Sequence, residues 1–156
     1  MDEHARALIR LHGLEPHPEG GHYRRIHASA VEVEAKGLRR PAMTAIRYLL
    51  GAGQRSAWHR VDADEAWHWE QGGPLELLQF EPTAGVLSRT RLGPAPDGEA
   101  LSCIVPAGTW QSARAWAEAV LVQCAVAPGF VWEGFELLAP GSDVARELQR
   151  RGVVQP

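Results

Sequence analysis

The stretch from Gly53 to Gly72 reads GQRSAWHRVDADEAWHWEQG, and it combines two histidines, several carboxylates and three tryptophans. An acidic turn separates two segments of strand length, residues 57–61 and 65–70. His59 and Glu65 therefore fall at the ends of adjacent strands. A polar cluster flanked by aromatic side chains is typical of a cavity that excludes water and orients a ligand. The alternative interpretation is a tryptophan-rich core with surface charges at the turn.

Outward from this stretch, glycines and prolines divide the chain into short segments, which is the rhythm of an all-β sandwich or barrel. Strands are predicted over residues 44–50, 57–61, 65–70, 75–80, 86–92, 101–105 and 120–126. A further strand is predicted after residue 130. Phe130 and Trp132 share one face and Phe135 and Leu137 the other, and a bulge at Gly134 would produce this change of face. Seven or eight antiparallel strands predict a jelly-roll barrel. No linker or repeat interrupts the pattern, so residues 1–156 are expected to form a single domain.

Two short helices are predicted, one near each end of the chain, and both are expected to pack against the outside of the β core. Residues 3–12 place apolar side chains at helical spacing, with Asp2 as the expected N-cap and Gly13 as the stop. Residues 143–150 follow Ser142, which is expected to cap the second helix.

Composition excludes several classes of partner. The formal net charge is -3, which argues against nucleic-acid binding because phosphates attract a concentrated positive face. No apolar run approaches the ~20 residues that span a bilayer, and the first residues lack the features of a secretion signal. Cys103 and Cys124 lie in apolar runs and are interpreted as buried small hydrophobes. A cytoplasmic protein with neither nucleic-acid nor membrane partners is expected.

The spacing of the opening stretch resembles the first motif of the cupin superfamily: Gly53, five residues, His59, one residue, Val61, three residues, Glu65, six residues, Gly72. The segment Pro106-Ala-Gly-Thr-Trp-Gln111 resembles the second cupin motif. In the order of the chain, residues 16–24, 58–68, 105–111 and 127–137 also resemble a small single-domain cupin branch, and the resemblance covers residues 8–138. It implies a double-stranded β-helix, a homodimer and a small-molecule cavity inside the barrel.

The resemblance also implies where a metal would bind, and the chain departs from that pattern. Typical metal-binding cupins use three histidines and one glutamate, whereas here only His59 and Glu65 stand at those positions. Val61 and Gln111 replace the other two histidines. Two strong ligands are usually too few for tight binding of a transition metal, so no metal cofactor is expected. If a divalent metal is bound, its ligands would be His59 and Glu65 with His68 or Gln111, although strand alternation places His68 on the face opposite Glu65.

Without a metal, the same positions predict acid–base chemistry. Glu65 lies beside Trp67 in the sequence, and desolvation by neighbouring indoles would raise its pKa toward neutrality. His59 ordinarily titrates in that range. These two residues are the catalytic candidates, and a structural hydrogen bond between them is the alternative. The ligand-binding candidates are Glu19, Tyr48, Trp67, His68, Trp110 and Gln111.

Three functions remain open at this point. The first is a metal-independent isomerase or epimerase that acts on a polar, carbohydrate-like metabolite, by analogy with metal-free sugar-nucleotide epimerases of the same fold. The second is a metal-dependent oxygenase or lyase, and the third is a non-catalytic binding or sensor module. The arginines Arg24, Arg25, Arg39 and Arg40 are expected to lie on the solvated surface.

Overall fold

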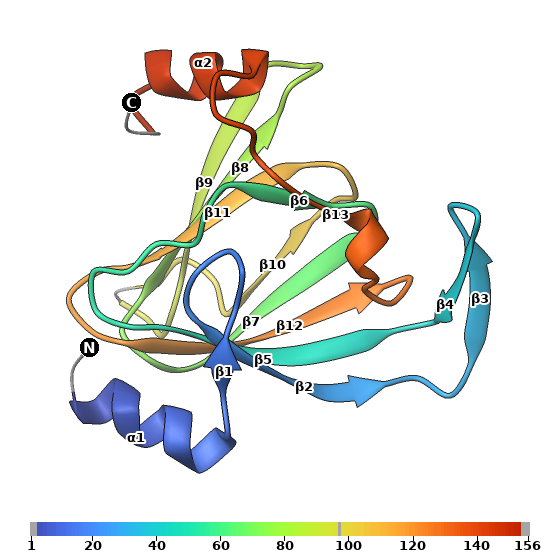
Figure 1. Ribbon diagram of the computed structural model, residues 1–156. Coiled ribbons are helices and arrows are strands. Elements are labelled where there is room, and N and C mark those ends of the chain that lie inside the picture. Colours follow the sequence, from blue (N-terminus) through green and yellow to red (C-terminus); the bar gives the residue numbers. More distant parts are fainter. Residues whose placement is uncertain (1–2, 97, 154–156) are drawn as a thin grey trace.

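The computed structural model describes residues 3–96 and 98–153, which fold into two antiparallel sheets that face each other (Figure 1). The first sheet has six strands in the order β1-β2-β5-β12-β7-β10, and the second has five in the order β13-β6-β11-β8-β9. The strands of the first sheet are β1 (Glu15–Pro16), β2 (His22–Ala28), β5 (Thr44–Leu50), β7 (Asp64–Gly72), β10 (Ser102–Val105) and β12 (Val120–Ala127). Those of the second are β6 (His59–Val61), β8 (Leu75–Glu81), β9 (Val86–Leu92), β11 (Trp110–Ala115) and β13 (Phe135–Leu137). The predicted all-β jelly roll with short terminal helices is confirmed.

The inner face of the first sheet changes character along its length. The pairs Val126–Thr44 and Cys124–Ile46 on β12 and β5 line a cavity, whereas the pair Val120–Leu50 lies in the buried core. On the neighbouring strand β7, residues 65 and 67 likewise line the cavity. The core therefore fills one end of the barrel, and the other end is left open for a ligand.

The two helices cover the outside of the barrel, as predicted. Helix α1 (Glu3–His12) packs Ala5 and Leu8 in a cluster with Leu49 and Leu121, and it ends at Gly13, which has a φ of +59°. The expected cap Asp2 lies outside the described residues.

Helix α2 (Asp143–Arg150) begins at the predicted cap. The Ser142 Oγ accepts a hydrogen bond from the Ala145 N–H at 3.2 Å. Leu148 of this helix is fully buried in a cluster with Trp58, Phe80 and Trp110. Among the described residues, no helix is both long enough and apolar enough to cross a membrane.

Several strands carry no alternating apolar pattern, and the sequence did not predict them. β2 is largely exposed, and β11 buries polar residues between β6 and β8. In place of a bulge at Gly134, a short 3-10 turn (Trp132–Gly134) precedes β13.

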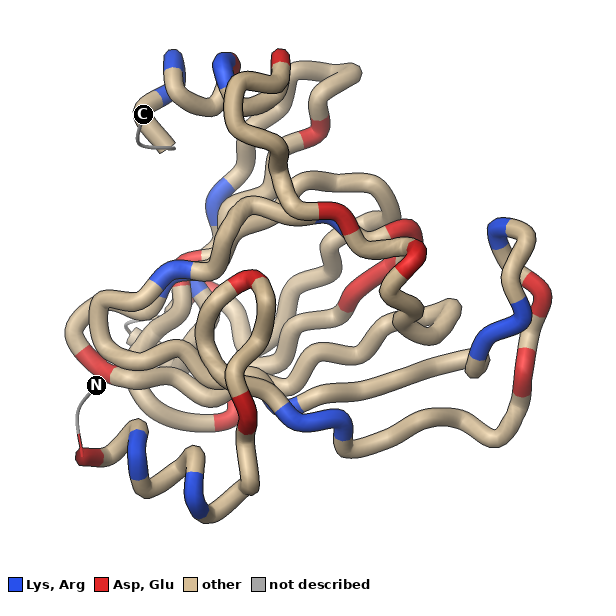
Figure 2. The backbone as a smooth tube through the Cα atoms, viewed as in Figure 1, with Lys and Arg blue, Asp and Glu red and all other residues tan. Residues whose placement is uncertain are grey.

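A small hairpin, β3 (Glu32–Ala35) and β4 (Leu38–Pro41), projects beyond the barrel (Figure 1). At its base, Arg40 is 1% exposed, and its guanidinium donates two hydrogen bonds of 2.9 Å to the Asp62 carboxylate and one of 2.6 Å to the Gly129 carbonyl. The expectation that Arg40 is a solvated surface residue is therefore wrong, because a bidentate pair and a backbone acceptor compensate its burial. Charges of both signs alternate along this hairpin and along α2, as Figure 2 shows.

Candidate functional site

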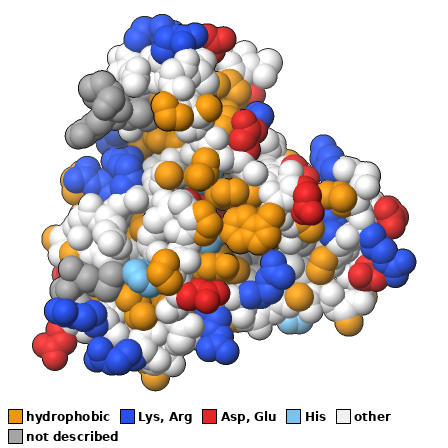
Figure 3. Space-filling model, viewed as in Figure 1, with side chains coloured by type: hydrophobic (Ala, Val, Ile, Leu, Met, Phe, Trp, Pro, Cys, Tyr) orange, Lys and Arg blue, Asp and Glu red, His pale blue; other side chains and the backbone are white. Residues whose placement is uncertain are grey.

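The cavity at the open end of the barrel has a volume of about 280 Å³. It lies between the two sheets, and hydrophobic side chains gather over the same central region of the molecule's face in Figure 3. The residues that line it are Glu15, His17, Glu19, Tyr23, Arg25, Thr44, Ile46, Tyr48, His59, Val61, Glu65, Trp67, Cys124, Val126, Phe130, Trp132 and Phe135. The volume is at the lower end of the range of ~300–1,000 Å³ for small-molecule sites, which suits a small metabolite.

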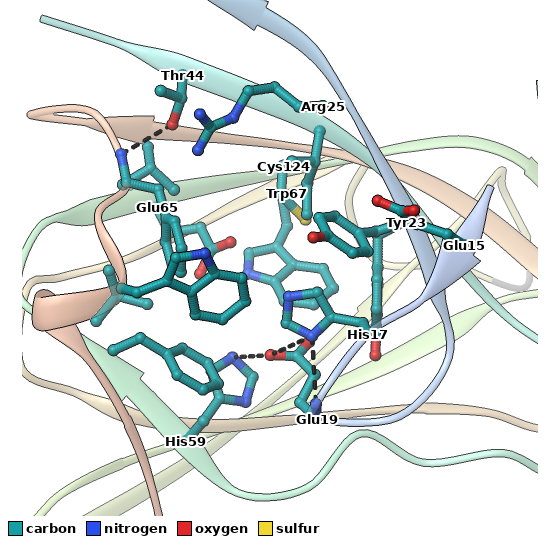
Figure 4. A pocket seen from close by; sticks show the side chains of 17 residues that line it. Glu15, His17, Glu19, Tyr23, Arg25, Thr44, His59, Glu65, Trp67 and Cys124 are labelled. Carbon is teal, nitrogen blue, oxygen red and sulfur yellow. Dashed lines mark hydrogen bonds and ion pairs between the residues drawn. The ribbon is translucent and has the colours of Figure 1, made fainter. Parts of the chain in front are cut away.

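The floor of the cavity is formed by His59 and Glu19, which come from β6 and from the loop before β2. The His59 Nε2 lies 3.1 Å from a Glu19 carboxyl oxygen (Figure 4). The His59 Nδ1 lies 2.8 Å from the Ala57 carbonyl oxygen. Because a carbonyl only accepts, Nδ1 carries the proton, and Nε2 of the neutral ring is an acceptor that faces Glu19.

Burial sets the protonation of this pair. Desolvation lowers the pKa of His59, and it raises the pKa of Glu19 to about 8. At neutral pH the stable arrangement is therefore a neutral imidazole that accepts a hydrogen bond from a protonated carboxyl group. The pair holds one exchangeable proton inside the cavity.

Glu65 on β7 supplies a second buried carboxyl group to the same cavity. One of its oxygens accepts a hydrogen bond of 2.5 Å from the Gln111 amide, and the Gln111 oxygen accepts one of 2.9 Å from the Trp67 indole. Burial raises the pKa of Glu65 to about 6, against the opposing effect of His59. Glu65 is therefore mostly ionised at neutral pH, whereas Glu19 is mostly protonated.

The loop that carries Glu19 is fixed against β5. The Tyr48 hydroxyl donates a hydrogen bond of 2.8 Å to the Gly20 carbonyl. Gly21 has a φ of +71°, and a β-carbon there would collide with the Leu49 carbonyl, so only glycine allows this approach. This close contact between Gly21 and β5 fixes the loop and, with it, the position of Glu19.

An aromatic cluster forms the wall of the cavity beside Glu19 and His59. His17 contacts the edge of Tyr23 at 4.5 Å between ring centroids and stacks on Trp132 at 5.8 Å. Burial lowers the pKa of His17 to about 4, with the nearby His59 adding to the effect, so this ring is neutral. Its Nδ1 accepts a hydrogen bond of 3.3 Å from the Glu19 backbone N–H.

The structure brings five of the eight predicted site residues together around the cavity: His59, Glu65, Glu19, Tyr48 and Trp67. Gln111 lies directly behind this wall, where it hydrogen-bonds to Glu65 and Trp67.

The remaining two predicted ligand-binding residues lie elsewhere, which corrects the sequence analysis. His68 is exposed, because it alternates with Trp67 along β7 and faces out of the barrel. Trp110 alternates with Gln111 on β11 and packs in the cluster under α2, with the Arg60 guanidinium over its ring. Neither side chain lines the cavity, so His68 cannot complete a metal site with Glu65 in this fold.

Other cavity residues were missed by the sequence analysis. The aromatic wall includes Phe130, Trp132 and Phe135, which lie in the segment 127–137 that resembled the cupin branch but had no assigned role. Alternation along β5 would have placed Thr44 beside Ile46 on the inner face. Arg25 is exposed, as expected, but it also lines the cavity, and no sequence signal distinguished it from Arg24.

A two-sheet antiparallel barrel with a polar cavity at one end defines a cupin-type jelly roll. The chain belongs to the family described as Cupin superfamily (DUF985), whose sequence model matches residues 6–138. It is similar to a solved hypothetical protein from Leishmania major, with 31% identity, a TM-score of 0.85, and coverage of 96% of this chain and 95% of that one. A protein from Shewanella oneidensis is similar at 32% identity and a TM-score of 0.84, covering 96% of this chain and 93% of that one.

More distant structures share the fold alone. KdgF from Halomonas sp. has 18% identity and a TM-score of 0.55, with coverage of 76% of this chain and 88% of that one. Oxalate decarboxylase from Bacillus subtilis has 16% identity and a TM-score of 0.59, with coverage of 89% and 34%. The search of curated proteins gave no match.

The donor groups of the cavity do not fit the metal that typical cupins hold. Val61 has no donor atom, and both amide atoms of Gln111 are engaged by Glu65 and Trp67. The His59 Nδ1 lies on the Ala57 carbonyl, and its Nε2 faces Glu19. Within residues 3–96 and 98–153, no group of three or more His, Cys, Asp or Glu side chains is arranged to hold a metal ion. The groups available for chemistry in this cavity are therefore its own side chains.

Proposed function

We propose that this cupin is an isomerase or epimerase that moves protons on a small, polar, carbohydrate-like metabolite without a metal ion. The observation that carries the proposal is the convergence of Glu65, Glu19 and His59 on one cavity. Burial separates the two carboxyl groups, with pKa values of about 6 and about 8, so that one is a base and the other an acid at neutral pH.

In the proposed reaction, the Glu65 carboxylate takes a proton from a carbon atom next to a substrate carbonyl. The Glu19–His59 pair gives its shared proton to the carbonyl oxygen, and an enol forms. Glu65 then returns the proton that it took. Delivery to the opposite face of the original carbon, after the enol turns in the cavity, gives an epimer, and delivery to the neighbouring carbon gives an isomer. The pair recovers its proton in that second half, so no net proton is consumed.

Two features of the cavity support this assignment. The Gln111 amide holds one Glu65 oxygen in place, and Trp67 orients that amide in turn. The aromatic wall places apolar surface beside the carboxyl groups, which reduces their solvation.

The proposal is tested by exchange of carbon-bound hydrogen in D₂O, followed by proton NMR. A panel of aldoses, ketoses and their acids and phosphates is incubated with the protein. We expect loss of the signal next to the carbonyl of at least one compound. In the Glu65→Gln variant that rate should fall by about 10²–10⁴-fold, the usual contribution of a general base.

The matched control is Glu118→Gln, which makes the same change at an exposed site outside the cavity and should keep the wild-type rate. Equal exchange rates in Glu65→Gln and the wild type would contradict the assignment of Glu65 as the base. Tight binding of a panel compound without any exchange would instead favour a non-catalytic binding module.

A further inference from the structure

The two ends of the cavity differ in chemistry. Glu19 and His59 lie at one end, and Figure 4 shows the Arg25 guanidinium on the far side, near Thr44. Arg25 is the one lysine or arginine among the described residues that line the cavity. The acid–base groups and the positive charge are therefore separated by the space that a ligand would fill.

Arg25 has no carboxylate partner within the described residues, in contrast to many arginines of this chain. Arg40 pairs with Asp62, Arg47 pairs with Glu70 and Arg60 pairs with Glu136. Glu15 also lines the cavity, but it makes no ion pair with Arg25 in the part of the chain that the structure describes. A cation that faces a cavity without a protein partner is available to an anionic ligand.

The local backbone places a second donor at the same end. Arg25 on β2 pairs with Ile46 on β5, and Thr44 lies two residues along β5 on the same face. The Thr44 Oγ1 accepts a hydrogen bond of 2.9 Å from the Phe130 N–H, which leaves its own proton free to donate. β2 also bulges directly after Arg25, and bulges commonly redirect side chains beside binding sites.

We propose that Arg25 and the Thr44 hydroxyl bind an anionic group of the substrate, a carboxylate or a phosphate, at the end of the cavity opposite Glu19 and His59. This inference rests on the proposed function in that it names the substrate class of the same site. The substrate is then a sugar acid or sugar phosphate whose charged group lies at Arg25 while its carbonyl reaches the acid–base groups. Arg25 is a specificity-determining residue in this arrangement.

Three probes that differ at a single carbon test the proposal: glucose, glucuronate and glucose 6-phosphate. Binding is measured by calorimetry and by the fluorescence of Trp67 and Trp132, which line the cavity. We expect the wild-type protein to bind at least one of the two anions about tenfold more tightly than glucose, the scale of a charge-assisted hydrogen bond. The preferred anion shows whether the site is built for carboxylate or for phosphate.

The Arg25→Gln variant should lose that preference by about tenfold and bind glucose as the wild type does. The matched control is Arg24→Gln, because Arg24 is the neighbour on β2 that is exposed like Arg25 but does not line the cavity, and it should keep the preference. The proposal is overturned by equal affinities of the wild type for all three sugars, by no binding of either anion in the millimolar range, or by an equal effect of the two substitutions.

These outcomes separate this inference from the proton-transfer proposal. If the anions bind through Arg25 but no panel compound exchanges its carbon-bound hydrogen, the catalytic proposal fails and the anion site stands. If exchange is as fast for neutral sugars as for charged ones and needs Glu65 but not Arg25, the anion site fails and the catalytic proposal stands.

Discussion

At the residue scale, the protonation of Glu19 decides the chemistry of the cavity. A carboxylate opposite the lone pair of the neutral His59 ring would be repelled, whereas a carboxylic acid donates a hydrogen bond to that lone pair. The separation of 3.1 Å between His59 Nε2 and a Glu19 oxygen is short enough for that hydrogen bond, and burial favours the neutral form of both groups. The Glu19 carboxyl group thus carries a proton at the position from which the proposed reaction donates one.

This protonation has a consequence for stability. The pKa of Glu19 is about 8 in the folded protein and near its ordinary value of 4.5 in the unfolded chain. Between these values the folded state binds the extra proton, so stability decreases as pH rises. Below about pH 6.5 the lowered pKa values of His17 and His59 have the opposite effect, because the unfolded chain then binds more protons on histidine. The effect of Glu19 is therefore clearest from about pH 6.5 to about pH 8.

We predict that the wild-type protein loses about 1 kcal/mol of unfolding free energy across this window, because the loss through Glu19, at most ~1.4 kcal/mol per pH unit for one proton, is partly offset by the two histidines. The Glu19→Gln variant should lose much less, since its amide does not titrate and can still donate to His59. Urea denaturation at several pH values measures both slopes, with Glu118→Gln as the exposed control. A wild-type slope that Glu19→Gln leaves unchanged would show that Glu19 is not the titrating group.

The sequence identified some of these residues and missed others for physical reasons. His59 and Glu65 were found because their spacing places them at the ends of adjacent strands. His68 and Trp110 lie outside the cavity, because a motif names residues that are neighbours in sequence, and strand alternation sends neighbours to opposite faces. Arg25 has no local signal, since its place in the cavity depends on the pairing of β2 with β5, which the hairpin β3–β4 separates in the sequence.

At the scale of elements, the hairpin β3–β4 is joined to the barrel by the buried Arg40, which pairs with the partly exposed Asp62. Arg40 at its base joins the hairpin to Asp62, which lies between β6 and β7, and to the Gly129 carbonyl before the aromatic wall. Arg40 also lowers the pKa of Asp62 through hydrogen bonding. This contact connects three separate segments near the open end of the barrel.

Removing the Arg40 side chain should therefore destabilise the folded protein. We predict that Arg40→Ala lowers the unfolding free energy by about 3 kcal/mol, because Asp62 and the Gly129 carbonyl lose their partner. The control is Arg39→Ala in the same hairpin, whose ion pair with Glu32 is exposed and should contribute less than about 1 kcal/mol. Chemical denaturation measures both, and similar losses in the two variants would contradict a specific role for the buried pair.

Elements with a clear apolar pattern were predicted within a few residues. β5 and β9 have the expected bounds, and both helices were found. The strand β11 was missed because Gln111, Ser112 and Arg114 interrupt its pattern. Its Ser112 hydroxyl donates to the Ser56 carbonyl, so burial of this polar group is compensated by a contact that no local pattern reveals.

At the scale of the whole molecule, the barrel combines a filled end with a hollow one. Leucine and valine side chains pack the core at one end. Ionisable side chains line the cavity at the other end. The cupin resemblance correctly predicted the barrel, and the cavity volume and its two chemically different ends required the structure. Homodimerisation stays a prediction of that resemblance.

The central claim is that this hollow end holds two carboxyl groups whose pKa values lie near neutrality and apart from each other. The most direct measurement is a pH titration of the glutamate side-chain carboxyl carbons by ¹³C NMR, with the signals assigned through Glu19→Gln and Glu65→Gln. We predict midpoints of about 8 for Glu19 and about 6 for Glu65. Midpoints for both residues near the ordinary value of 4.5 would contradict the account.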